Sequence, residues 1–228
     1  MEVALALLGI TTRASSADAV VQETIGILAI QGDFALHARM LDRIGVPWML
    51  VKHASDLDAV SGLIMPGGES TTMLKFFEGE GLQAAILDFA AQGKPIFGTC
   101  AGAILLAKEV LNPAQAHLGL IDITVERNAY GRQIDSAVRP VKFSEFTQDG
   151  GREEQPVGMV FIRAPIIRRV GQGVRVLGRA DGVPVLVEQG NVLAATFHPE
   201  LTDDERVHRY FAGKVLGAGA GGRSSGER

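Results

Sequence analysis

The chain has 228 residues, 46% of them apolar, and a net charge of −4. This length and composition suit one α/β domain with a sizeable core, and the mixed, mildly acidic charge excludes the basic surface of a nucleic-acid binder. A single cysteine, Cys100, excludes an internal disulfide and indicates a reducing compartment, which we take to be the cytoplasm. No apolar run reaches the roughly eighteen residues needed to span a bilayer.

The two ends of the chain differ from its middle. Residues 3–10 are apolar, but Glu2 stands where a signal peptide needs positive charge. We therefore interpret residues 1–23 as a flexible extension ahead of one domain over residues 24–216. Residues 217–228 are rich in Gly, Ser and Arg and predict a flexible tail.

Strands and helices alternate in the first half of the chain. Short apolar runs predict strands at residues 24–30, 48–51, 62–65 and 95–99. Helical periodicity predicts helices at residues 34–44, 72–77, 82–91 and 101–110. This alternation predicts a doubly wound, mainly parallel sheet of flavodoxin-like type, with helices on both faces.

The second half is dominated by short β-type runs. We expect strands at residues 138–143, 157–163, 174–178, 183–188 and 192–197, forming an antiparallel extension of the same sheet. Thr202 and Glu205 have the spacing of a capping box, with Thr202 as the N-cap of a last helix.

Cys100 lies in the sequence Gly98-Thr99-Cys100-Ala101-Gly102, between a predicted strand and a predicted helix. This G-x-C-x-G pattern is typical of a nucleophile elbow, in which a sharp turn exposes the central side chain. A helix N-terminus favours the thiolate, and the N–H of Ala101 is placed to stabilise an oxyanion. A buried structural cysteine is the alternative, which the flanking glycines and the strand-to-helix context disfavour.

His198 is the candidate base for this nucleophile. It follows a predicted strand, and Pro199 favours an extended conformation at His198. Glu200 then lies on the same side of the extended segment and can orient the imidazole. The pair could also suggest a metal site, but the sequence has no second ligand cluster, so we predict no metal. The other histidines (His37, His53, His117 and His208) have no comparable partner and are interpreted as bystanders.

The turn Pro66-Gly67-Gly68-Glu69-Ser70 follows a predicted strand, as Gln31 and Cys100 do. In parallel sheets, ligands bind at the carboxyl ends of the strands, so we expect these three segments to share one site. Paired glycines let backbone N–H groups approach an anion, although most Gly-Gly turns only reverse the chain.

Taken together, these motifs resemble the class I, triad-type glutamine amidotransferases. The blocks IMPGGESTTM, GKPIFGTCAG, VERNAYGRQ, FIRAP and TFHPELTDD are similar, more narrowly, to the glutaminase subunits of pyridoxal 5′-phosphate synthase. The resemblance covers residues 24–215. It implies hydrolysis of L-glutamine to glutamate and ammonia through a thioester, with a catalytic triad of Cys100, His198 and Glu200.

The resemblance also implies the remaining site residues. The N–H groups of Gly68 and Ala101 would form the oxyanion hole. Glutamine would be bound by a set of six residues: Gly68, Glu69, Ser70, Arg127, Ile162 and Arg163. An arginine fork suits the carboxylate of a free amino acid.

The partner implied by the resemblance is a (β/α)₈-barrel synthase subunit, in a large hetero-oligomer that receives the ammonia. Pyridoxal phosphate would be the product of that complex, so no cofactor is expected on this chain. Other interpretations are a glutaminase for histidine or nucleotide synthesis, a non-catalytic interaction module, and a Cys-dependent stress protein or peptidase. The presence of all three triad residues and the F-H-P-E motif argues against the last two.

Overall fold

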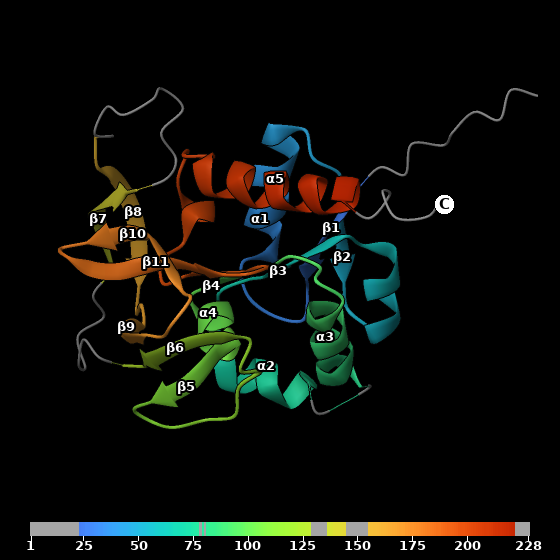
Figure 1. Cartoon of the computed structure of the whole chain (residues 1–228), viewed down its shortest axis with the longest axis horizontal. Coiled ribbons are helices and arrows are strands. Elements are labelled where there is room, and N and C mark those ends of the chain that lie inside the picture. Colours follow the sequence, from blue (N-terminus) through green and yellow to red (C-terminus); the bar gives the residue numbers. More distant parts are fainter. Residues whose placement is uncertain (1–22, 78, 80, 129–135, 145–154, 222–228) are drawn as a thin grey trace, which may run out of the picture.

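A nine-stranded mixed sheet forms the centre of the molecule (Figure 1). The computed structural model describes residues 23–77, 79, 81–128, 136–144 and 155–221. The parallel part of the sheet contains β1 (Ile25–Leu28), β2 (Trp48–Val51), β3 (Gly62–Met65), β4 (Ile96–Thr99) and β12 (Val192–Ala195). These strands lie in the order β2-β1-β3-β4-β12 and pair in parallel.

The sheet continues beyond β12 with antiparallel strands. They are β11 (Val183–Gln189), β10 (Arg175–Ala180), β7 (Ser136–Phe143) and β8 (Val157–Ile162), in that spatial order. Each pairs antiparallel with its neighbour. The predicted fold class is therefore confirmed: an α/β, mainly parallel sheet with an antiparallel extension in the C-terminal half. The placement of residues 192–197 in that extension is wrong, because β12 pairs in parallel with β4 and only its other edge pairs antiparallel, with β11.

Helices cover both faces of the parallel part (Figure 1). On one face lie α1 (Phe34–Ile44) and α5 (Arg206–Gly221). On the other lie α2 (Ser70–Phe77), α3 (Leu82–Ala91) and α4 (Ala101–Leu106). Two 3₁₀ turns, η1 (Ala54–Ala59) and η2 (Pro199–Leu201), complete the helical segments described. None of the helices described is both long and apolar enough to cross a bilayer.

Burial on both faces explains why the central strands are continuous apolar runs. Every residue of β1, β3, β4 and β12 is buried. Strands that alternate apolar and polar residues would expose one face, whereas these strands bury both. Two apolar layers result, one against α1 and α5 and one against α2, α3 and α4. The carboxyl ends of the parallel strands lie between these two layers.

A smaller sheet of three strands, none of them predicted, contradicts one predicted helix end. It contains β5 (Ala107–Leu111), β6 (Ile121–Glu126) and β9 (Ile166–Val170), in the order β5-β6-β9. The prediction of a helix to about residue 110 is wrong, because α4 ends at Leu106 and the chain then pairs with β6. Ala107 and Val110 are both buried, a spacing of three that is typical of a helix. The strand departs from regular alternation here, with a register shift between Ala107 and Glu109.

The predicted capping box is also wrong. The last helix begins at Arg206, and Thr202 instead follows the 3₁₀ turn η2. The Thr202 hydroxyl donates a hydrogen bond to the Pro199 carbonyl oxygen at 2.9 Å and so closes that turn. Asp204 takes over the capping, since its Oδ1 accepts a hydrogen bond from the Arg206 N–H at 3.0 Å.

The ends of the chain are described only in part. Residues 1–22 and 222–228 lie outside the described residues, so the character of the N-terminal extension and of most of the tail stays a prediction. At the C-terminal side, α5 continues to Gly221, past the predicted domain end at residue 216.

Candidate active site

Cys100 occupies a sharp turn between β4 and α4. Its backbone has φ 47° and ψ −101°, a conformation that non-glycine residues rarely adopt. The turn is held on both sides, because the Cys100 N–H donates to the Ala195 carbonyl oxygen at 2.8 Å and the Ile104 N–H donates to the Cys100 carbonyl oxygen at 3.1 Å. Strain of this kind is common where a side chain must be presented to a ligand. The geometry is that of a nucleophile elbow.

The two glycines of the motif allow α4 to pack directly on the sheet. A Cβ on Gly98 would lie 2.6 Å from the carbonyl carbon of Gly102, and a Cβ on Gly102 would lie 2.1 Å from the carbonyl oxygen of Met65. Neither distance is tolerable for a carbon atom. The G-x-C-x-G pattern therefore has a steric cause, which is the close approach of the helix to the strands that position Cys100.

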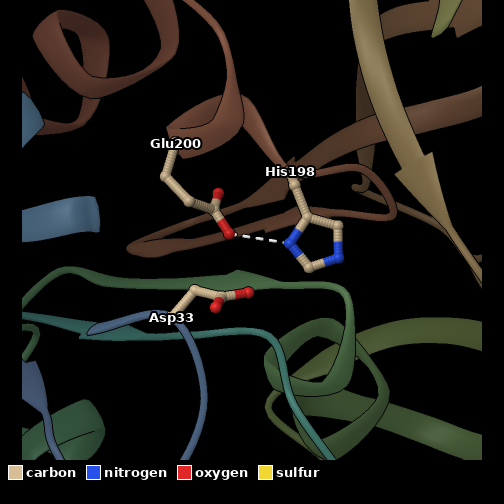
Figure 2. Close-up of side chains that lie close together, drawn as sticks. All are labelled: Asp33, His198 and Glu200. Atoms are coloured by element: carbon tan, nitrogen blue, oxygen red, sulfur yellow. Dashed lines mark hydrogen bonds and ion pairs between the residues drawn. The ribbon is translucent and has the colours of Figure 1, made fainter. Parts of the chain in front are cut away.

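His198 and Glu200 form a buried hydrogen-bonded pair (Figure 2). His198 Nδ1 lies 2.7 Å from Glu200 Oε1, and both residues are only 4% exposed. The His198 N–H also donates to the Val160 carbonyl oxygen at 2.8 Å, which ties the base to β8. The predicted extended segment is wrong beyond His198, because Pro199 opens the 3₁₀ turn η2. That turn brings the carboxylate back to the imidazole.

Gly67 brings the imidazole next to the nucleophile. A Cβ on Gly67 would lie 2.4 Å from His198 Cε1 and 3.4 Å from Cys100 Cβ, so both side chains pack against this glycine. The Cys100 thiol also lies 3.9 Å from the Ile162 carbonyl oxygen, to which it can donate. Cys100 is buried, with 8% exposure, so its side chain is reached through the pocket and does not stand free in solvent.

Electrostatics favour a charged imidazole at this site. Burial by itself lowers the pKa of His198, but the hydrogen bonds and charges of Cys100 and Glu200 outweigh it and raise the pKa to about 10. Burial likewise raises the pKa of Glu200, but His37 and His198 outweigh this and the pKa is lowered. At neutral pH the pair is therefore an imidazolium and a carboxylate.

A polar pocket opens over Cys100. Its lining comes from four segments that are far apart in the sequence: Gly68, Glu69 and Ser70; Cys100 and Ile104; Arg127 and Asn128; Ile162, Arg163 and Pro165. All six residues predicted to bind glutamine are in this set. Sequence reasoning missed Ile104, Asn128 and Pro165, which carry no distinctive chemistry in the sequence. Ala101 is not among the lining residues, so its predicted role rests on its backbone N–H alone.

Arg127 is the cation best placed to receive an anion in the pocket. Its Nη2 lies 3.5 Å from Glu69 Oε1, while its Nη1 is buried and has no hydrogen-bond partner among the described residues. An unpaired buried guanidinium N–H is costly and indicates a site for a ligand. Gln31 completes this edge, since its Oε1 accepts from the Glu69 N–H at 3.0 Å.

Two histidines that were interpreted as bystanders are part of the site. His37 on α1 and His208 on α5 are fully buried, and their Nδ1 and Nε2 atoms lie 2.9 Å apart. His37 Nε2 lies 3.4 Å from Glu200 Oε2, so the interpretation that these histidines lack partners is wrong. One signal was present in the sequence: His37 shares the apolar face of its helix with Ala38 and Leu41.

Asp33 adds a third group beside the pair. Asp33, His198 and Glu200 offer ligand atoms that all lie within 4.8 Å of one another, and Figure 2 shows the Asp33 carboxylate close to the other two. An ion bound between His198 Nδ1 and Glu200 Oε1 would have to replace their 2.7 Å hydrogen bond. Three ligands of which two already bind each other make a poor metal site. That the chain needs no metal stays a prediction.

Known proteins share this sequence and this fold. The chain matches the SNO glutamine amidotransferase family over residues 27–216. A pyridoxal 5′-phosphate synthase subunit PdxT from Solibacter usitatus is 54% identical over 192 residues, which are 84% of this chain and 98% of that protein. A protein of the same name from Koribacter versatilis is 52% identical over 197 residues, which are 86% and 98% of the two chains.

Solved structures agree with the sequence comparison. A crystal structure of a glutamine amidotransferase has a TM-score of 0.77 and 44% identity, covering 84% of this chain and 98% of its own. The structure of PurLQS from Thermotoga maritima has a TM-score of 0.64 at 19% identity over 86% of this chain and 97% of its own, which shows a shared fold only. On its family match and on relatives with more than half of their residues identical, this chain belongs to the SNO glutamine amidotransferase family.

Proposed function

We propose that this chain is the glutaminase subunit of a pyridoxal 5′-phosphate synthase, with Cys100, His198 and Glu200 as its catalytic triad. The observation that supports this most strongly is the buried 2.7 Å pair of His198 and Glu200 beside Cys100, which lines a pocket together with Arg127. The names of the relatives support the choice of pathway.

The reaction begins at the amide carbon of glutamine. Cys100, as the thiolate partner of the protonated His198, attacks this carbon and forms a tetrahedral oxyanion. His198 then gives its proton to the leaving nitrogen, the C–N bond breaks, and ammonia departs from a thioester. His198 next takes a proton from water, whose oxygen attacks the thioester and releases glutamate and Cys100. Glu200 holds the imidazole and stabilises its charged form throughout.

Backbone and pocket groups serve the two ends of the substrate. The N–H groups of Gly68 and Ala101 stabilise the oxyanion, since donors aimed at developing charge act best in a site that excludes water. Arg127 binds the glutamine carboxylate through the N–H that has no protein partner among the described residues. The remaining proposed contacts come from Glu69, Ser70, Ile162 and Arg163, which line the same pocket.

Ammonia is the product that matters for the partner. In this proposal the partner is a (β/α)₈-barrel synthase subunit in a large hetero-oligomer, and ammonia passes to it through a protected tunnel. Docking near the Gln31 and Gly68 turns would couple partner binding to the oxyanion site, since the Glu69 N–H is bonded to Gln31. A glutaminase for histidine or nucleotide synthesis remains the alternative, with no observation on the site that favours it.

The test is glutamate release from glutamine by the purified chain, with and without the synthase subunit of the same organism. We expect the synthase to raise the rate. Cys100→Ala should abolish hydrolysis by either preparation, because no other group in the pocket can form the thioester. The substitution removes one small buried side-chain atom, so the variant should remain folded and should still bind the synthase.

Each result has a definite meaning. If the rate of glutamine hydrolysis is the same with and without the synthase, the glutaminase activity is supported and the proposed partner is excluded. Ammonia release by Cys100→Ala would exclude Cys100 as the nucleophile. If the wild type releases no glutamate with or without the synthase, a non-catalytic interaction module becomes the better interpretation.

A further inference from the structure

A fully buried polar cluster lies behind Glu200, on the side away from the pocket. It contains His37 from α1, Thr99 from the end of β4 and His208 from α5, all at 0% exposure. His37 Nδ1 lies 2.9 Å from His208 Nε2, and His37 Nε2 lies 3.3 Å from Thr99 Oγ1. Polar side chains are buried at a cost unless they bond one another. These contacts make His37 the central member of the cluster.

Glu200 presents its second carboxylate oxygen to this cluster. Oε1 is bonded to His198, whereas Oε2 is buried without an ordinary hydrogen bond among the described residues. His37 Nε2 lies 3.4 Å from Oε2, within ion-pair distance but longer than most hydrogen bonds. A buried carboxylate is stable only when its oxygens face donors. The imidazole of His37 therefore faces the oxygen that the catalytic contact leaves free.

The protonation of the two core histidines follows from their burial. Burial lowers the pKa of His37, and the charge of Glu200 only partly opposes it. Burial also lowers the pKa of His208, to about 3, and His37 adds to the effect. Both imidazoles are therefore neutral at pH 7, and each carries one N–H. His37 acts on Glu200 through an N–H dipole and not through a full charge.

The hydrogen-bond pattern selects one tautomer of His37. If His208 Nε2–H donates to His37 Nδ1, then His37 carries its proton on Nε2, which lies 3.3 Å from Thr99 Oγ1 and 3.4 Å from Glu200 Oε2. The reverse direction would aim a bare lone pair at the carboxylate and would leave an N–H on His208 Nδ1, which has no partner among the described residues. Buried N–H groups without acceptors are rare, so the first direction is favoured.

Aromatic packing fixes the plane of the His37 ring. Its centroid lies 6.3 Å from that of Phe97, with the two rings at 89°, and the His208 ring packs edge-on against the same Phe97 at 6.1 Å. Edge-to-face contacts of this kind are favourable. The ring cannot turn away from Glu200 without losing them.

We propose that His37 is a positioning residue of the glutaminase site, which holds Glu200 Oε2 through its Nε2–H and so keeps Oε1 aimed at His198. The proposal rests on the triad function proposed above. It extends the site from three side chains to a relay that runs from His208 through His37 and Glu200 to His198. His37 touches neither the pocket nor Cys100 and acts on the reaction only through Glu200.

Among the described residues, four titratable groups face His37. Glu200 comes from η2, His198 from the segment before it, His208 from α5, and Asp33 from the start of α1 itself. Among these, Glu200 and Asp33 raise the pKa of His37 and His198 lowers it. The pH dependence of kcat in His37 variants is therefore interpreted in terms of these four groups.

Two polar substitutions of His37 differ only in reach. In His37→Gln the side-chain amide can place an N–H near the position of Nε2. In His37→Asn the amide is one methylene shorter and reaches only the position of Nδ1. His37→Leu removes both nitrogens. We expect kcat for glutamine hydrolysis, with the synthase present, to fall about tenfold to a hundredfold in His37→Asn and His37→Leu, and less than about threefold in His37→Gln. KM should change little in all three.

A second measurement does not depend on activity. The ring nitrogens of His198 are followed by ¹⁵N NMR in the labelled full chain as pH is raised. The wild-type ring should lose its proton near pH 10. Loss of the His37 donor weakens the support of Glu200 for the imidazolium, so this titration should move at least about one pH unit lower in His37→Asn and stay near the wild-type value in His37→Gln.

The outcomes separate this proposal from the proposed function. If the wild type does not hydrolyse glutamine, the function fails, and the NMR titration still decides the role of His37. Equal losses in His37→Gln and His37→Asn would overturn the proposal in favour of simple packing, as would an unchanged His198 titration in His37→Asn. If His37→Leu does not fold, the two amide variants carry the comparison alone.

Discussion

The two sides of Glu200 hold histidines in opposite charge states. On the pocket side, His198 has a pKa raised to about 10, whereas on the core side the pKa of His208 is lowered to about 3. Both rings are almost completely buried. Burial alone would keep both neutral, so their neighbours must account for the difference.

The neighbours differ in charge. The hydrogen bonds and charges of Cys100 and Glu200 raise the pKa of His198, whereas His208 contacts the neutral imidazole of His37. An adjacent anion can outweigh the cost of burying a cation, but a second imidazole cannot. The site therefore places its charged pair at the pocket and backs it with a neutral layer, which adds no competing cation near Glu200.

The largest expected effect on kcat comes from changing the charged pair on the pocket side of Glu200, which is His198 and Glu200 itself. His198→Asn loses the group that moves the proton, and we expect kcat to fall by roughly 10²–10⁴-fold. Glu200→Gln keeps the base and loses one charge-assisted hydrogen bond, worth about 1.5–3 kcal/mol, or roughly 10–150-fold in rate. Steady-state glutamate release with the synthase present measures both. Equal losses in the two variants would contradict the separate roles of base and orienting group.

A steric change to the pocket side should have the next largest effect. In Gly67→Ala the new Cβ would lie 2.4 Å from His198 Cε1, so the ring must move away from Cys100. We expect kcat to fall by about 100-fold, because small displacements of reacting groups are costly. Gly213→Ala on α5 is the matched control, since a Cβ there meets nothing within 4 Å and should leave the rate unchanged. A Gly67→Ala enzyme within twofold of the wild type would show that Gly67 does not set the His198 position.

Local patterns were sufficient to predict the pocket side. The elbow at Cys100 depends on residues within one short turn, and the distance between His198 and Glu200 is fixed by two peptide units. The alternation of strands and helices then places the Gly67 turn and Cys100 at one edge of the sheet. These features have short-range signatures, so the fold class and the candidate triad could be predicted from local patterns, whereas the glutamine-binding residues were implied only by the family resemblance.

The core side could not be predicted in the same way. His37 and His208 are separated by 171 positions and meet only because α1 and α5 cover the same face of the sheet. A lone histidine on a helix carries no sign of such a partner. The predicted end of α4 was wrong for a related reason, since Ala107 and Val110 fit a helix until their pairing with the next strand, β6, is known. Domain bounds and the individual roles of the glutamine-binding residues stay predictions.

The smallest expected effect concerns stability on the core side. The folded-state pKa of His208, about 3, lies below the unfolded value of 6.5, so below pH 6.5 the unfolded chain binds a proton that the folded chain does not. Stability should therefore fall as pH drops from 6.5 toward 3, by up to about 1.4 kcal/mol per pH unit for this group. His198 has the opposite sign, because its raised pKa gives stability that is lost as pH rises toward 10. The free energy of unfolding is measured in urea at pH 7.5 and pH 5. We expect its loss between these two pH values to be about 2 kcal/mol smaller in His208→Gln than in the wild type. The same pH dependence in both proteins would mean that His208 is charged in the folded state, and the contrast between the two sides of Glu200 would be lost.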